Sequence, residues 1–166
     1  MYEKFEKYTV NNVPGIGYEV WGQWKDDIHD IRSRLVFDFH SYKVLEADAQ
    51  AVSIPFDICQ QGIDNIKYIV GEFAGPGFNK KVRQYLMGSN GCIHLAELVG
   101  NSLKSVLQAA SRETPEWVDE EEYNKRWGVW EALFKDTCIY FSQPDALKNL
   151  QHKVQNDFKD RLNEAE

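Results

Sequence analysis

Residues 28–40 are Ile-His-Asp-Ile-Arg-Ser-Arg-Leu-Val-Phe-Asp-Phe-His, and this stretch decides the fold of the chain. Apolar and polar residues alternate along it: one face carries Ile31, Leu35, Phe37 and Phe39, and the other carries Arg32, Arg34, Asp38 and His40. Successive side chains of a β-strand point to opposite faces. The period of two therefore predicts a strand with one buried and one solvated face.

Shorter segments of strand-like composition flank this stretch, at residues 5–10, 18–24, 42–47 and 51–55. The cluster Asn-Asn-Val-Pro-Gly at residues 11–15 is typical of a turn between strands. A second tight turn is expected near Asp48. The sequence therefore predicts an antiparallel meander of four or five strands, with one face on the core.

The spacing of the apolar residues changes after Asp57. Residues 58–73 carry apolar side chains at helical spacing, with Asp57 as the expected N-cap and Gln60 completing a capping box. Residues 71–81 are expected to end this helix and form a loop. Three more helix starts are predicted near residues 89–91, 114–115 and 142–145. The predicted fold class is α+β, with the meander followed by about four helices packed on one face.

Length and composition fit one folded domain. A chain of 166 residues with 43% hydrophobic residues can bury a core of its own. We therefore expect a single domain over residues 1–166, with residues 113–166 as its helical C-terminal part. The net charge of -7 disfavours nucleic acid and anionic membranes as partners. A small molecule or a protein is the expected class of partner.

The sequence also predicts where the protein works. No apolar run approaches the roughly 20 residues that a membrane span needs, and the first residues do not resemble a signal peptide. The sequence therefore predicts a cytoplasmic protein with no membrane partner. In that compartment the three cysteines are expected to be reduced thiols.

Two cysteines stand at predicted helix starts. Cys92 is followed by His94 at one of them, and Cys59 lies in the first turn of another. The N–H groups at a helix N-terminus stabilise a thiolate, so we expect a lowered pKa that would make either cysteine a nucleophile or a metal ligand. The alternative is that both thiols are ordinary buried residues and that His94 only hydrogen-bonds to a neighbour.

A second pair of polar residues lies on the long strand. Asp38 and His40 are two residues apart, so they share a strand face, and the carboxylate could orient the imidazole. An ordinary solvated surface pair is the alternative. Together His40, Cys59, Cys92 and His94 form a set of ligands that suits zinc or iron, although no Cys-x-x-Cys motif is present.

Three segments carry a resemblance to a known family: residues 35–40 with Asp38 and His40, residues 58–59, and residues 91–98. On these motifs the chain resembles a bacterial domain family of unknown function that has an Asp-x-His strand, a Cys-Pro helix start and a Cys-Thr-His-Leu-x-Asp-Leu helix start. The chain departs from that pattern at Gln60, Ile93 and Glu97. The resemblance covers about residues 28–112 and implies no known activity, substrate or cofactor.

Three functions remain open from the sequence. The first is a non-enzymatic binding or accessory domain with a Cys/His site. The second is a metal-binding or iron–sulfur-handling protein, with zinc or iron as the cofactor. The third is a thiol-dependent enzyme that uses Cys92.

Overall fold

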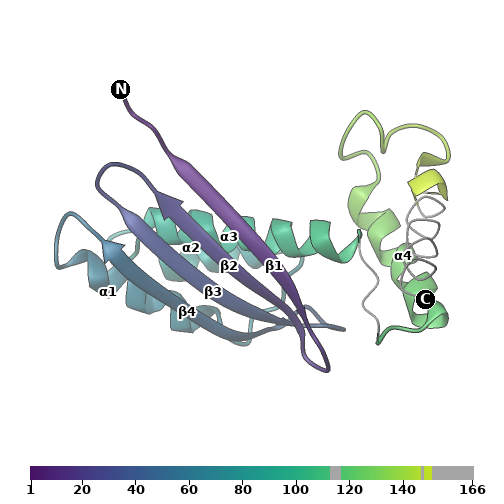
Figure 1. Cartoon of the computed structure of the whole chain (residues 1–166), viewed down its shortest axis with the longest axis horizontal. Helices are drawn as coiled ribbons and strands as arrows, with labels where there is room; N and C mark the ends of the chain where they lie inside the picture. Colours follow the sequence, from purple (N-terminus) through teal and green to yellow (C-terminus); the bar gives the residue numbers. More distant parts are fainter. Residues whose placement is uncertain (113–116, 147, 151–166) are drawn as a thin grey trace, which may run out of the picture. The chain divides into compact units, whose positions relative to one another are not determined.

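The computed structural model describes residues 1–112, 117–146 and 148–150 (Figure 1). The chain forms two compact units, Met1–Leu107 and Gln108–Glu166. Each unit is described by itself below, and the prediction of a single domain over the whole chain stays a prediction.

The first unit contains a four-stranded antiparallel meander. Its strands are β1 (Phe5–Val13), β2 (Gly17–Lys25), β3 (Asp30–Asp38) and β4 (Val44–Ser53), and they lie in this order in the sheet. The predicted meander is therefore confirmed. The predicted turn near Asp48 is wrong, because β4 is continuous there and Asp48 pairs with Arg34. The irregularities in the β3–β4 register lie nearer the strand ends, at Asp30/Ile31 and Val36/Phe37.

The helices of this unit cover one face of the sheet, with α2 and α3 lying behind the strands in Figure 1. Leu35 and Phe37 of β3 are fully buried, as the alternation along residues 28–40 predicts. Their neighbour Arg34 lies on the other face, where its guanidinium contacts the carboxylate of Glu19 at 2.6 Å and that of Glu46 at 2.6 Å. The inner face is therefore apolar core and the outer face is a charged surface.

The predicted helix over residues 58–73 is shorter and less regular than expected. It consists of α1 (Cys59–Asp64) and a 3-10 helix, η1 (Asn65–Ile69). The predicted capping box is wrong: the N-cap is Ile58, without a side-chain hydrogen bond, and Gln60 donates to Asp64 at 2.7 Å instead. The apolar spacing is satisfied because Ile63, Ile66 and Ile69 are all buried.

A helix lies where the sequence predicts a loop. After Gly77, α2 runs over Phe78–Leu86. Its core residues are Phe78, Val82 and Leu86, a spacing of four that places all three on one buried face. The glycines and proline just before α2 are typical of a loop, so this short pattern does not predict a helix from the sequence alone. The next helix, α3 (Ile93–Ala110), is confirmed, and it buries Leu95, Leu98, Val99 and Val106.

The second unit contains α4 (Glu120–Phe134). Asp119 is its N-cap and accepts a hydrogen bond from the Glu122 N–H at 2.8 Å. The predicted start at residues 114–115 lies outside the described residues, and Trp117 precedes the helix rather than belonging to it. Of the helix predicted after residues 142–145, Ala146 and residues 148–150 are helical, and the rest lies outside the described residues.

Among the helices in the described part of the chain, none has the length and apolar character needed to cross a bilayer.

Candidate functional site

Three segments meet at one end of the sheet, which we call the His29 end and define by Asp26, His29, Cys59, Cys92 and His94. The connection between β2 and β3 turns here, because Lys25 pairs with Asp30. The end of β4 lies alongside, since Ser53 pairs with Asp30 and its hydroxyl donates to the Ile28 carbonyl at 2.7 Å. The chain then enters α1, which packs on the start of α3.

The two helix-start cysteines lie on the segments that meet at the contact between α1 and the start of α3. A methyl group added to Gly62 would lie 2.9 Å from the Gly91 carbonyl carbon and 3.1 Å from the Cys92 nitrogen, so the backbones touch there. Cys59 stands three residues before Gly62 and shares its helix face. Both thiols are free and half-buried. The structure therefore places Cys59 and Cys92 on two segments in contact, and Cys59 lies near enough to affect the pKa of Cys92.

The environment of Cys92 differs from the expected one. Burial raises the pKa of the Cys92 thiol, and the nearby Cys59 raises it further. The backbone N–H groups of Leu95 and His94 donate to the sulfur and act in the opposite direction, but burial outweighs them. The expectation of a lowered pKa is thus wrong for Cys92, and its thiol is protonated at neutral pH. This arrangement does not favour a thiol-dependent enzyme.

We expect Cys92 to react slowly with alkylating agents. At pH 7 the exposed Cys138 should be modified by iodoacetamide before Cys92, because only the thiolate is the nucleophile and access limits the rate. A time course of peptide mass spectrometry on the native protein measures the order. Faster modification of Cys92 than of Cys138 would show that the helix N-terminus dominates after all.

His94 turns toward the sheet and packs on two aromatic rings. Its ring centroid lies 4.1 Å from that of Trp24 in β2 and 4.3 Å from that of His29 in the β2–β3 connection. The Trp24 and His29 rings meet edge to face at 5.6 Å. Two imidazoles and an indole therefore form one cluster at the His29 end.

Asp26 holds His29 in place. Its carboxylate accepts hydrogen bonds from the backbone N–H groups of Ile28 and His29 at 2.8 and 2.6 Å, and lies 3.1 Å from His29 Nδ1. Burial alone would raise the pKa of this carboxyl, but these hydrogen bonds outweigh it and lower the pKa to about 2. Asp26 is therefore a carboxylate at every physiological pH, and it orients the His29 ring.

His94 is the titratable imidazole of this cluster. Burial lowers its pKa from the usual value near 6.5, and the nearby His29 lowers it further. Glu97 and Asp26 act in the opposite direction, while Lys4 adds to the lowering. The His94 ring is consequently neutral at pH 7.

This shift predicts a pH-dependent stability. The unfolded chain binds a proton at His94 near pH 6.5, whereas the folded chain does so only at lower pH, so the free energy of unfolding should fall as the pH drops below 6.5. His94→Gln should reduce that fall between pH 7 and 5, and His40→Gln is the matched control. Urea titrations in a buffer containing EDTA measure it. An unchanged slope in His94→Gln would refute the assignment.

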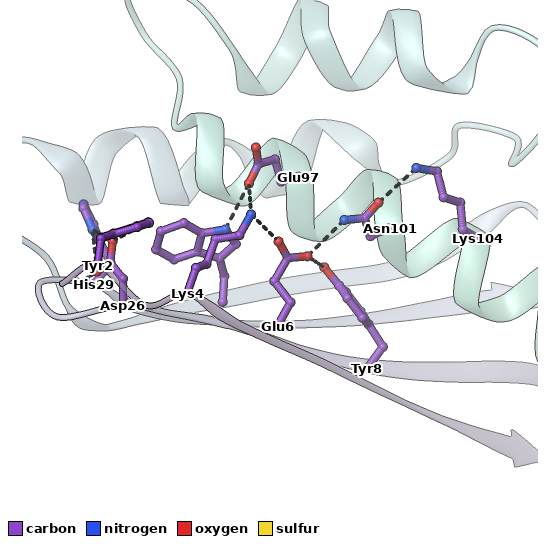
Figure 2. A network of polar contacts seen from close by, with 10 residues as sticks. Tyr2, Lys4, Glu6, Tyr8, Asp26, His29, Glu97, Asn101 and Lys104 are labelled. Atoms are coloured by element: carbon purple, nitrogen blue, oxygen red, sulfur yellow. Dashed lines mark hydrogen bonds and ion pairs between the residues drawn. The ribbon is translucent and has the colours of Figure 1, made fainter.

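Figure 2 shows how a polar network continues from this cluster along α3. The Trp24 indole N–H donates to Glu97 at 3.0 Å. The Lys4 ammonium lies 3.6 Å from the same carboxylate and 2.7 Å from Glu6. Lys4 thus links the N-terminal segment to α3 through two carboxylates.

Glu6 is the second centre of this network. It accepts hydrogen bonds from the Tyr8 hydroxyl at 2.8 Å and from the Asn101 amide at 3.0 Å (Figure 2). Burial opposes ionisation of Glu6, but the bonds from Lys4, Tyr8 and Asn101 prevail and lower its pKa. The same carboxylate and burial raise the pKa of Tyr8, so the phenol stays protonated. The hydrogen bonds of Glu6 therefore hold β1 against α3.

A cavity of about 810 Å³ borders the network. It is lined by Met1, Glu3, Lys4, Phe5, Lys25, Asp26 and Asp27. Lys4 and Asp26 belong both to the cavity wall and to the hydrogen-bonded groups described above. Two residues of the cavity wall thus have hydrogen-bond or ion-pair partners outside it.

The predicted Asp38–His40 pair serves a different purpose. The Asp38 carboxylate accepts a hydrogen bond from the Ser41 N–H at 2.7 Å and closes the turn between β3 and β4. The exposed His40 ring meets Phe39 edge to face at 5.3 Å. This turn lies at the opposite end of β3 from His29, so His40 is not near His94.

Of the four predicted metal ligands, Cys59 and Cys92 lie on segments in contact with each other, and the His94 ring packs on Trp24 and His29. Across residues 1–112, 117–146 and 148–150, no three His, Cys, Asp or Glu side chains gather closely enough to hold a metal ion. Metal binding at Cys59, Cys92, His94 and His40 stays a prediction.

Sequence reasoning missed His29 and Asp26. His29 was placed on the long strand and Asp26 was not singled out, but β3 begins only at Asp30. The signal that could have found them is the segment Asp26-Asp27-Ile28-His29. An aspartate between two strands is typical of a turn, because its carboxylate can accept hydrogen bonds from N–H groups two and three residues later. Their approach to His94 has no counterpart in the sequence.

Comparison with known proteins gives one match. The model of the family described as "Protein of unknown function (DUF2889)" matches residues 18–108, and the chain therefore belongs to this family. The match runs from β2 to α3 and contains the whole His29 end, which confirms the resemblance to a family of unknown function. No curated protein and no solved structure matches the chain.

Proposed function

We propose that this member of the DUF2889 family is a non-enzymatic binding domain, and that its ligand site is the cavity beside the His29 end. One observation carries the proposal: Lys4 and Asp26 line the cavity and are also held by buried or half-buried partners. A pocket whose wall is fixed before binding loses little entropy when a ligand enters. Location in the cytoplasm is part of this proposal.

The charges in the cavity favour a small molecule that carries an ammonium group. The wall has three carboxylates, Glu3, Asp26 and Asp27, and two lysines. The ammonium of Lys4 is bound by Glu6 and Glu97, and that of Lys25 lies 3.9 Å from Asp30. Both lysines thus have carboxylate partners outside the cavity. Asp26 is engaged by His29, so the exposed carboxylates of Glu3 and Asp27 remain to attract a cationic ligand.

A thermal-shift screen of the full chain tests the proposal. We expect primary amines and amino acids at millimolar concentration to raise the melting temperature, and matched carboxylic acids without an amine to leave it unchanged. The Asp27→Asn variant should lose this response. Asp27 is exposed and lies in the cavity wall, so its substitution leaves the packed network intact.

Asp57→Asn is the matched control. Asp57 is likewise an exposed aspartate in a connecting segment, but it lies before α1 and outside the cavity. If Asp57→Asn removes the thermal-shift response as strongly as Asp27→Asn does, the response is a nonspecific charge effect. No response to any amine would refute the proposed ligand class.

Metal binding at the thiol pair is the second candidate function. It is supported by the approach of Cys59 and Cys92, because soft thiolate ligands select zinc and iron–sulfur groups. Metal analysis of untagged protein tests it. Stoichiometric zinc or iron that disappears in Cys59→Ser supports this function, whereas metal-free protein that gains none on incubation with Zn²⁺ or Fe²⁺ contradicts it.

A further inference from the structure

The pair of imidazoles at the His29 end has an arrangement that packing alone does not require. His29 and His94 come from different elements, yet their ring centroids lie 4.3 Å apart with the ring planes tilted by 58°. Both side chains are half-buried rather than enclosed. Each ring therefore keeps some access to solvent while it contacts the other.

Asp26 determines which nitrogen of His29 can bind a ligand. Its carboxylate oxygens lie 3.1 and 3.2 Å from Nδ1 (Figure 2), so Nδ1 carries the proton and donates it to the carboxylate. The lone pair then resides on Nε2. A carboxylate behind the imidazole is the usual support of a metal-ligating histidine, because it fixes the ring and raises its basicity.

The separation of the rings fits ligation of one ion. An imidazole nitrogen binds Zn²⁺ at about 2.0–2.1 Å, which places the ring centroid roughly 3.2 Å from the ion. Two rings on one ion would have centroids about 4.5 Å apart at the roughly 90° angle of a tetragonal Cu²⁺ or Ni²⁺ site, and about 5.2 Å apart at the tetrahedral angle of Zn²⁺. The observed 4.3 Å is close to the first value, and the rings must separate by about 1 Å to bind Zn²⁺.

We propose that His29 and His94 bind a divalent transition-metal ion such as Zn²⁺, with Asp26 as the outer carboxylate. Imidazole nitrogen suits zinc, nickel and copper. The chain supplies two ligands, and the remaining positions are open to water or to an added ligand. This site differs from the thiol pair. It shares Asp26 with the wall of the proposed amine cavity, but its two ligands, His29 and His94, lie outside that wall.

Calorimetric titration of Zn²⁺ into the untagged, EDTA-treated full chain tests the site. We expect one ion per chain, at least a tenfold loss of affinity in His29→Gln and in His94→Gln, and a loss of about 10–100-fold in Asp26→Asn. His40→Gln is the matched control and should bind as the unmodified protein does.

Two measurements on the unmodified protein avoid the risk that a variant misfolds. Zn²⁺ should protect His29 and His94, but not His40, from diethyl pyrocarbonate. Cu²⁺ should quench part of the tryptophan fluorescence, because Trp24 is an indole that packs on His94.

The proposal is overturned by any of three results: no saturable Zn²⁺ binding, equal loss of affinity in His40→Gln, or equal labelling of all these histidines with and without Zn²⁺. Loss of binding in Cys59→Ser with full binding in His29→Gln would also overturn it, because the ion would then lie on the thiol pair. Failure of the amine screen has no bearing on these outcomes.

Discussion

Phe37→Ala should lower the free energy of unfolding by about 3–5 kcal/mol. Phe37 lies on the inner face of β3 and is fully buried under the helices. Truncation removes most of an aromatic side chain and leaves a cavity that rigid neighbours from the sheet and α3 cannot fill completely. The change should appear as a lower urea midpoint with an unchanged slope, because the fold and the exposed area are the same.

Arg34→Ala is the control on the opposite face of the same strand. Its guanidinium contacts Glu19, Glu46 and Asp48 in ion pairs at the surface, and such pairs contribute roughly 0–1 kcal/mol each. We expect a loss well below that of Phe37→Ala. Equal and small losses in the two variants would mean that the inner and outer faces of β3 have been exchanged.

Gly91→Ala should be the second strongly destabilising change, with a loss of about 3 kcal/mol. A methyl group at this position would lie 2.4 Å from the carbonyl carbon and oxygen of Leu86 and 2.6 Å from the Met87 nitrogen. These are backbone atoms at the end of α2, so no side-chain rotation can relieve the clash. The connection between α2 and α3 must move, and Cys92 moves with it.

Gly75→Ala is the matched control for that change. Gly75 lies in the connection before α2, and a methyl group there would meet no atom within 4 Å. We expect a change within about 0.5 kcal/mol, as for other surface substitutions. Thermal unfolding of both variants beside the unmodified protein measures the difference. A Gly91→Ala protein as stable as Gly75→Ala would show that the α2–α3 connection is not tightly packed.

Phe37→Ala and Gly91→Ala test different contacts of the first unit. Phe37 tests the layer in which helices cover one face of the sheet. Gly91 tests the close approach of the end of α2 to the segment that leads into α3. If Gly91→Ala changes the reactivity of Cys59 and Cys92 as well as the stability, the thiol pair depends on this contact.

Much of the fold could be predicted from local patterns. The alternation along residues 28–40 predicts both the strand and its buried face, because the side chains of a strand alternate whatever the rest of the chain does. The spacing of Leu95, Leu98 and Val106 predicts α3 in the same way. The helix α2 was missed because its three apolar residues follow a cluster of glycines typical of loops.

The candidate site could be predicted only in part. Cys59 and Cys92 were identified as helix-start cysteines and as members of one set of possible metal ligands. The pKa of Cys92 was not foreseen correctly, because burial depends on α1 and a helix start alone says nothing of it. His40 was grouped with His94, although the meander carries it to the far end of β3.

By itself, the sequence determined the elements with strong periodicity, the buried face of the sheet, the α+β class and the two helix-start thiols. Only the tertiary structure decided that His29 and Asp26 meet His94 and that Lys4 links the N-terminal segment to Glu97. The physical reason is the separation of the residues along the chain. Side-chain periodicity acts over a few neighbouring residues, whereas these contacts join segments some 65 to 93 positions apart, which only the packing of α3 on the sheet brings together.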